Sequence, residues 1–197
     1  MNGIAEILVN RRLLLIGDYK LGSGKPTPYY INLRKLPSYP EFNDVVGLAV
    51  SKLANVNFDY VLGVATAGVP LASFIASRTG KPMGYARSER KGYGNNSLIE
   101  GDINGKNIVV IDDVMVSGDA ALLAVSEAKK AGANIAAVLV VVDRKEGGSA
   151  HIKGMDINLI ALYNMNDILK DLVDKKLIGS KETAIMHEYL QKNLKPE

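Results

Sequence analysis

The chain has no cysteine, so disulfide bonds and thiolate metal sites are excluded. Its two histidines, His151 and His187, are too few for a histidine-rich metal site. No apolar run reaches the length of about 18 residues that suggests a membrane span. The N-terminal residues also lack the basic, apolar and small-residue order of a signal peptide. We therefore expect a cytoplasmic protein that binds no membrane.

An excess of charge of one sign is also missing. The 24 Lys and Arg residues against 21 Asp and Glu residues give a net charge of +3, whereas nucleic-acid-binding proteins usually show a concentrated basic face. One dense basic cluster, "ARSERKGYGNN", contains Arg87, Arg90 and Lys91, and its glycines and asparagines indicate a mobile loop. We expect no nucleic-acid partner. The 197 residues, 47% of them hydrophobic, predict one domain with a sizeable core.

Apolar runs of strand length alternate along the chain with amphipathic segments of helix length. Strands are predicted at residues 60–64, 81–86, 107–112, 135–143 and 157–163. Helices are predicted within residues 41–56, 68–80, 117–133, 164–176 and 181–194. In the third of these, Asp119 is the expected N-cap and Gly132 the expected stop. Apolar strands that alternate with helices predict an α/β fold, with a central, mostly parallel, twisted sheet and helices on both faces.

The first 40 residues differ from this pattern. Residues 7–17 suggest a helix, and residues 19–35 have the glycine, serine and proline content of a loop or hairpin. We expect residues 1–40 to form a small N-terminal cap that contributes to the site. Residues 41–197 would then form the core.

Three predicted strands lead into chemically distinctive segments, "GVATAGVP", "IDDVMVSGDA" and "VVDRKEGG". Ligands of an open parallel sheet bind at the carboxyl ends of its strands. The small residues of the first segment allow close backbone approach, and its amides can face an anion. The third segment places Arg144 directly after an apolar strand. This edge of the sheet is therefore where we expect the site.

The adjacent acids Asp112 and Asp113 need compensation, because like charges repel and burial strengthens the repulsion. One interpretation is a solvated strand end. A second is the Mg²⁺-holding acid of a nucleoside triphosphatase, which also needs a phosphate loop. The segment "LGSGKPT" does not match that loop, because Tyr19 stands where the first glycine is required and Pro26 where Ser or Thr is required. A third fits more residues. The acids accept hydrogen bonds from neighbouring sugar hydroxyls, and the following loop wraps a phosphate with backbone N–H groups.

The segment "VVIDDVMVSGDA" resembles the phosphoribosyl-pyrophosphate motif of the type I phosphoribosyltransferases, and the rest of the chain resembles the orotate-using branch of that family. "SGKPTPYYINLR" is similar to the segment that borders the base site, and "ATAGVPLA" to the pyrophosphate loop. "RSERKGYG" is similar to the mobile catalytic loop, and "DRKEGG" to the segment whose arginine holds the orotate carboxylate. These segments in this order are much more specific than the acid pair alone.

The resemblance implies Mg²⁺-dependent transfer of the phosphoribosyl group from phosphoribosyl pyrophosphate to orotate, giving orotidine 5-monophosphate and pyrophosphate, a step of pyrimidine biosynthesis. The implied catalytic residues are Lys91, Asp112 and Asp113. The implied donor-binding residues are Thr66, Ala67, Arg87, Arg90, Lys91, Tyr93, Asp112, Asp113, Val114, Met115, Val116, Ser117, Gly118, Asp119 and Ala120. The implied orotate-binding residues are Lys25, Tyr29, Tyr30, Val116 and Arg144. Mg²⁺ would be held mainly by the substrate, near the two acids, without a direct protein ligand. The resemblance also implies a homodimer in which loop 87–97 reaches the neighbouring site.

The chain departs from the family pattern at five positions. In the mobile loop, Ser88 replaces a lysine of the family and Tyr93 replaces its histidine. Gly22 replaces a lysine before the N-terminal Ser-Gly, and Val116 and Asp119 replace two threonines of the phosphate loop. Asp119 places a negative charge beside the expected phosphate unless it points away as a helix cap. Two alternatives therefore stay open. One is a phosphoribosyltransferase for another base, and the other is a non-catalytic regulator that binds phosphoribosyl pyrophosphate.

Overall fold

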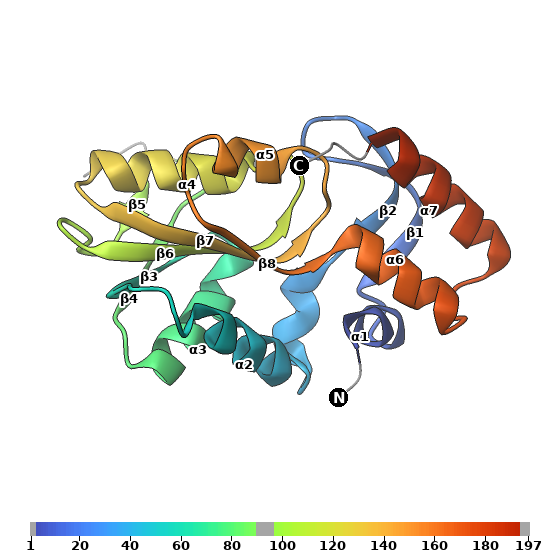
Figure 1. Cartoon of the computed structure of the whole chain (residues 1–197), viewed down its shortest axis with the longest axis horizontal. Coiled ribbons are helices and arrows are strands. Elements are labelled where there is room, and N and C mark those ends of the chain that lie inside the picture. The colour runs from blue at the N-terminus through green and yellow to red at the C-terminus, as the bar shows by residue number, and fades with distance from the viewer. Residues whose placement is uncertain (1–2, 90–96, 194–197) are drawn as a thin grey trace.

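The computed structural model describes residues 3–89 and 97–193, and a six-stranded sheet forms the centre of the described chain (Figure 1). The strands lie in the order β5-β4-β3-β6-β7-β8. Neighbouring strands are parallel, except that β4 and β5 are antiparallel. The expected mostly parallel sheet is confirmed. The strand bounds are β3 Tyr60–Val64, β4 Met83–Ala86, β5 Ile99–Glu100, β6 Asn107–Met115, β7 Asn134–Asp143 and β8 Leu159–Asn164.

Helices cover both faces of this sheet, as Figure 1 shows, with α2 and α3 on one face and α4 and α5 on the other. Val109 and Ile111 of β6 belong to the core cluster of α2 and α3, whereas Ile108 and Val110 belong to that of α4 and α5. All four side chains are fully buried. A strand covered on both faces needs apolar residues at every position, which explains the unbroken apolar run. The helix bounds are α2 Phe42–Leu53, α3 Gly68–Thr79, α4 Asp119–Lys130 and α5 Gly148–Lys153.

The N-terminal region is a helix followed by a hairpin. Helix α1 spans Ile4–Asn10, and the antiparallel pair is β1 Leu14–Lys20 and β2 Pro26–Ile31. Residues 19–35, expected to be a loop or a hairpin, contain the turn and the second strand of this hairpin, but the expected helix over residues 7–17 is wrong after Asn10. The chain turns at Arg12, where φ is 51°, and Leu14 then pairs with Ile31. Two of the leucines that suggested a helix instead begin a strand, in which Leu14 packs on the core and Leu15 is exposed.

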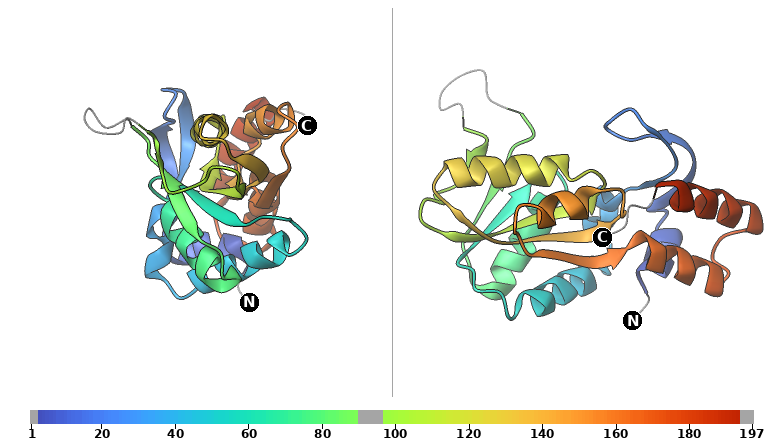
Figure 2. Two further views of the ribbon diagram at one scale, coloured as in Figure 1. Left: turned by 90° about the vertical axis from the view of Figure 1, so that its left-hand side faces the viewer. Right: turned by 45° about the horizontal axis from the view of Figure 1, so that its top comes forward.

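The C-terminal helices share this end of the molecule with the hairpin (Figure 2). Helix α6 spans Met165–Asp174 and contacts α1, while α7 spans Ser180–Asn193 and contacts both α6 and β2. The N-terminal and C-terminal segments thus pack together beside the sheet. The proposed division of the chain at residue 40 stays a prediction.

Several element boundaries differ from expectation near the acid pair. Strand β6 continues to Met115, so Asp113 also lies inside it, whereas the predicted strand ended at Asp112. Asp119 is the first residue of α4 and not its N-cap. That position belongs to Gly118, where φ is 85° and a Cβ would lie 3.2 Å from the Gly148 Cα. Three short elements were not predicted, namely β5, α5 and the 3-10 helix η1 Leu33–Ser38. Across residues 3–89 and 97–193, none of the helices combines the length and apolar character that crossing a membrane requires.

Candidate active site

The site lies where the connections of the sheet diverge. Strands β3 and β6 are parallel neighbours, but β3 leads through α3 to β4 on one side, and β6 leads through α4 to β7 on the other. Such a switch point leaves a crevice beyond the carboxyl ends of the two strands. A cavity of about 350 Å³ occupies it. Its lining residues are Leu21, Gly22, Ser23, Arg34, Val64, Ala65, Thr66, Ala67, Asp112, Asp113, Val114, Met115, Val116, Ser117, Gly118, Asp119 and Ala120.

Two glycines let the backbones around this cavity approach closely. A Cβ on Gly68, the first residue of α3, would lie 2.3 Å from the Ile111 carbonyl oxygen, so only glycine brings the start of α3 against β6. A Cβ on Gly148 would lie 2.8 Å from the Val116 carbonyl oxygen, which accepts a hydrogen bond of 2.9 Å from the Gly148 N–H. Gly148, the second glycine of "DRKEGG", therefore supports the loop that follows the acid pair.

The two acids face this cavity with little protein compensation. Asp112 is buried and Asp113 is half-buried, and one hydrogen bond joins them, from the Asp113 N–H to Asp112 Oδ1 at 2.9 Å. Burial, and then the charge of Asp113, raise the pKa of Asp112 well above its ordinary value. Burial also raises the pKa of Asp113. Arg34 lowers both pKa values, but less than burial raises them. The pair is therefore ready to accept hydrogen bonds or a cation from a ligand.

The loop after the acids supplies backbone donors and one unusual side chain. It runs from Val116 to Ala120, at the start of α4. The Ser117 hydroxyl donates to Asp119 Oδ2 at 2.7 Å, and Asp119 is exposed. The Asp119 carboxylate therefore lies at the rim of the loop and is held by its neighbour. His151 Nδ1 lies 3.0 Å from the Ser117 carbonyl oxygen and fixes the loop from α5.

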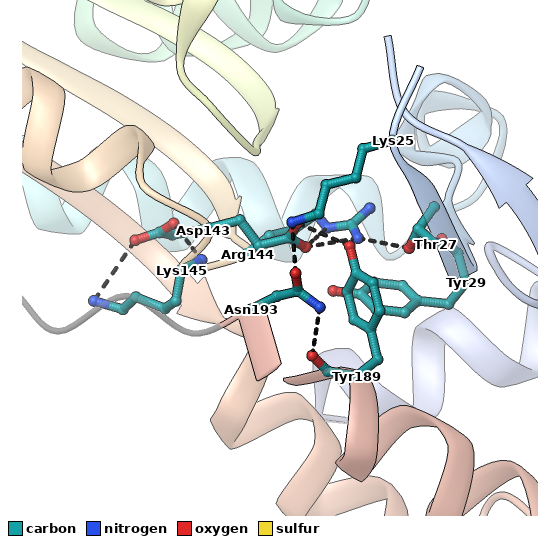
Figure 3. Close-up of polar contacts among 9 residues, drawn as sticks. Lys25, Thr27, Tyr29, Asp143, Arg144, Lys145, Tyr189 and Asn193 are labelled. Atoms are coloured by element: carbon teal, nitrogen blue, oxygen red, sulfur yellow. Dashed lines mark hydrogen bonds and ion pairs between the residues drawn. The ribbon is translucent and has the colours of Figure 1, made fainter. Parts of the chain in front are cut away.

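Arg144 lies in a separate buried cluster. Its Nε donates to Glu146 Oε1 at 2.9 Å, and its Nη2 donates to Thr27 Oγ1 at 2.9 Å and lies 2.8 Å from Glu146 Oε1. The guanidinium stacks over the Tyr29 ring at 4.1 Å, and 2% of the side chain is exposed (Figure 3). Neither Arg144 nor Tyr29 lines the cavity of the acid pair.

The other residues expected at the base site lie on the hairpin. Lys25 Nζ donates to Asn193 Oδ1 at 2.5 Å and lines a groove between the hairpin and α7. The Tyr30 ring lies 5.9 Å from the Tyr19 ring. Tyr29 is fully buried, and no described residue accepts from its hydroxyl. Burial raises the pKa of Tyr29, so the phenol stays neutral.

The expected pyrophosphate-binding residues fall into two groups. Thr66 and Ala67 line the cavity. Arg87 pairs with Glu100 at 3.2 Å, beyond the lining of the cavity. Arg90, Lys91 and Tyr93 lie outside the residues that the structure describes.

Arg34 was not predicted as a site residue, although it ends the segment "SGKPTPYYINLR". It follows β2 as the second residue of η1, and it is an exposed cation that lines the cavity with Asp112 and Asp113. The signal was its place in a segment that borders the base site in similar proteins. Leu21 and Ser23, from the hairpin turn, reach the same cavity.

The donor set fits a magnesium ion that a substrate mostly coordinates. Carboxylate oxygens suit Mg²⁺, which usually keeps water and substrate phosphates as further ligands. Asp112 and Asp113 supply such oxygens in the cavity. In the described part of the chain, no group of three or more His, Asp or Glu residues could hold a metal by itself.

The fold and the site define a phosphoribosyltransferase, because the acid pair and the loop after it lie at the switch point of a mostly parallel sheet, as in the type I phosphoribosyltransferases. Comparison with known proteins agrees: the phosphoribosyl transferase domain family matches residues 39–161. The orotate phosphoribosyltransferase of Sulfolobus acidocaldarius is 45% identical over 190 residues, which are 96% of each chain. The chain belongs to the orotate phosphoribosyltransferase branch of this family.

Solved structures support the same assignment. The orotate phosphoribosyltransferase of Aeropyrum pernix superposes with a TM-score of 0.77 at 34% identity, over 86% of this chain and 98% of the other. The UMP synthase of Leishmania donovani superposes with a TM-score of 0.87 at 28% identity. That match covers 96% of this chain and 42% of the longer protein.

Proposed function

We propose that this chain is an enzyme that transfers the phosphoribosyl group from phosphoribosyl pyrophosphate to a ring nitrogen of orotate. The products are orotidine 5-monophosphate and pyrophosphate. The observation that carries the proposal is the cavity in which the acid pair and the loop 116–120 meet the hairpin turn and Arg34. The names of the relatives point to the same base. A cytoplasmic location stays part of the proposal.

The residues of the cavity and Lys91 have different roles in the proposed reaction. Asp112 and Asp113 accept hydrogen bonds from the two ribose hydroxyls, which offset the repulsion between the acids. Backbone N–H groups of the loop 116–120 bind the 5-phosphate at the start of α4. Bond cleavage at the anomeric carbon builds negative charge on pyrophosphate, which Lys91 stabilises. Mg²⁺, when bound with the donor near the acids, supplies further charge stabilisation to the leaving group.

The base enters from the side of the hairpin in this proposal. Arg34 is the cation that faces the cavity, and Arg144 offers its free guanidinium edge to the orotate carboxylate, as the family resemblance suggests. Exclusion of water by the loop 87–97 protects the activated ribose from hydrolysis. The loop acts on the neighbouring subunit of a homodimer.

The direct test is loss of orotate absorbance when the protein is mixed with Mg²⁺, phosphoribosyl pyrophosphate and orotate. We expect rapid consumption, and a decrease in kcat of about 10²- to 10³-fold in Lys91→Ala, the size seen when one transition-state donor is removed. No consumption of orotate, with consumption of another base, would instead favour a different base specificity. Donor binding by calorimetry without turnover of any base would favour the regulator.

A mixing experiment tests the exchange of loops between subunits. Co-expressed Lys91→Ala and Asp112→Asn chains form heterodimers. If the loop acts on the partner, one of the two sites in each heterodimer has both an intact Lys91 and an intact Asp112; if the loop acts on its own subunit, neither site has both. We expect these heterodimers to recover about half of the wild-type activity, while each homodimer of a single variant stays inactive. Inactive heterodimers would show that each loop serves its own subunit.

A further inference from the structure

The C-terminal helix α7 makes a specific polar contact with the segment that carries Arg144. The Tyr189 hydroxyl donates to Glu146 Oε2 at 2.9 Å, and the Tyr189 ring meets the Tyr29 ring edge-on at 5.8 Å. Burial raises the pKa of Tyr189, so its hydroxyl keeps the proton that it donates. Figure 3 shows this cluster between the hairpin, the end of β7 and α7.

Glu146 links the helix to the arginine because its two oxygens have different partners. Oε1 accepts from Arg144 Nε at 2.9 Å, and Oε2 accepts from Tyr189. The Glu146 side chain is 3% exposed, so water does not replace either partner easily. Rotation of this carboxylate would break both contacts, and charge-assisted hydrogen bonds are costly to lose in a buried place.

Arg144 is consequently fixed on one face and along one edge. Its face lies on the Tyr29 ring, and its Nε and Nη2 are taken by Glu146 and Thr27. Because Nε and Nη2 donate to Glu146 and Thr27, Nη1 is the guanidinium nitrogen left for a ligand. A planar guanidinium held in this way presents its remaining donors in one direction. The Tyr189 hydrogen bond also draws negative charge on Glu146 away from the arginine, which leaves Nη1 a stronger donor.

We propose that Glu146 and Tyr189 are positioning residues for base recognition, and that α7 thereby takes part in the selection of an orotate-type carboxylate. The inference rests on the proposed function, because it needs Arg144 to meet the base. Neither residue needs to touch a ligand. Their role is to fix the direction and the charge of the Arg144 edge.

The variant Tyr189→Phe tests this role because it removes one hydroxyl and keeps the ring against Tyr29. We expect KM for orotate to rise about 5- to 10-fold, which is less than direct loss of a hydrogen bond to a charged group would cause, because Tyr189 acts on the base through Glu146 and Arg144. KM for phosphoribosyl pyrophosphate should stay within about 2-fold, since the donor cavity does not include Tyr189. The matched control is Tyr39→Phe, because Tyr39 packs on the same core cluster and lies outside this network. The control should leave both KM values unchanged.

The outcomes separate the two proposals. If the wild-type enzyme does not consume orotate, the proposed function is overturned, and the inference falls with it. If the wild-type enzyme is active and Tyr189→Phe leaves KM for orotate unchanged, only the inference is overturned. Equal increases in both KM values would also overturn it, because they indicate a general structural effect. Glu146→Gln provides a second reading: it keeps the shape, removes the charge, and should raise KM for orotate more than Tyr189→Phe does.

Discussion

The acid pair and the arginine cluster are two sets of buried charges at the same end of the sheet, and they are treated in opposite ways. Asp112 and Asp113 repel each other beside an open cavity, and burial raises the pKa of both. Arg144 has a carboxylate, a hydroxyl and an aromatic face around it. The acid pair has little protein compensation and is therefore suited to bind a ligand, whereas the partners of Arg144 fix its guanidinium in one place. The comparison therefore separates residues that bind, the acid pair and Arg144, from residues that position, such as Glu146 and Tyr189.

Breaking the compensated set should have the largest effect on stability. In Arg144→Met, Glu146 stays buried without its cation, and we expect the free energy of unfolding to fall by about 3–5 kcal/mol. Urea unfolding followed by circular dichroism measures this loss. In the double variant Arg144→Met/Glu146→Leu neither charge of this pair is left, so most of the loss should be recovered. A single variant within about 1 kcal/mol of wild type would mean that the ion pair does not support the fold.

Breaking the uncompensated set should have the reverse effect on stability. Because the pKa of Asp112 is raised in the folded protein, the folded state binds more protons than the unfolded state between the ordinary and the raised pKa. Stability therefore falls as pH rises through that window and stays low above it. In Asp112→Asn this cost is absent, so the variant should be more stable than wild type at pH 7 and nearly equal to it below pH 4.

Thermal unfolding at several pH values measures this difference. The melting temperature of Asp112→Asn at pH 7 should exceed that of wild type by several degrees, since 1 kcal/mol corresponds to about 2–4 °C in a chain of this size. Turnover should be lost in the same variant, because one acceptor for the ribose hydroxyls is weakened. Asp18→Asn, at an exposed position of the hairpin, is the control and should change neither property. A less stable Asp112→Asn protein would contradict the idea that the acid pair destabilises the fold.

The same contrast explains what the sequence could reveal. Strand β3 was predicted with its observed bounds, and the acid pair was found, because unbroken apolar runs and adjacent charges are local signals. The partners of Arg144 are not local. Thr27 and Tyr189 come from the hairpin and from the last helix, so their approach depends on packing that no short pattern encodes.

Two errors have related causes. The run "LLLIG" was predicted to be helical, although its leucines suit either a helix or a strand. In the structure Leu14 pairs with Ile31, so the run forms a strand. Asp119 was expected as an N-cap because aspartate is a good one. The close approach of Gly118 to Gly148 gives that place to glycine instead. In both positions a tertiary contact overrides the local preference.

The smallest expected effect concerns the charge that the family pattern does not predict. Asp119 stands in the loop proposed to bind the 5-phosphate, and the Ser117 hydroxyl holds its carboxylate at 2.7 Å. Asp119→Asn keeps the acceptor and removes the charge, so KM for phosphoribosyl pyrophosphate should fall about 2- to 5-fold, as fits an exposed charge near a helix start. Asp167→Asn, in the first turn of α6, is the matched control and should leave KM unchanged.

The salt dependence of this effect sharpens the test. Screening at high ionic strength weakens repulsion between exposed charges, so the advantage of Asp119→Asn should shrink between about 0.01 M and 1 M salt. An unchanged KM in the variant at low salt would show that Ser117 already turns the Asp119 charge away from the phosphate. The acid would then act only at the start of α4, where a negative charge stabilises the helix. Asp119 would in that case be a compensated charge, as Glu146 is, and would differ from the acid pair.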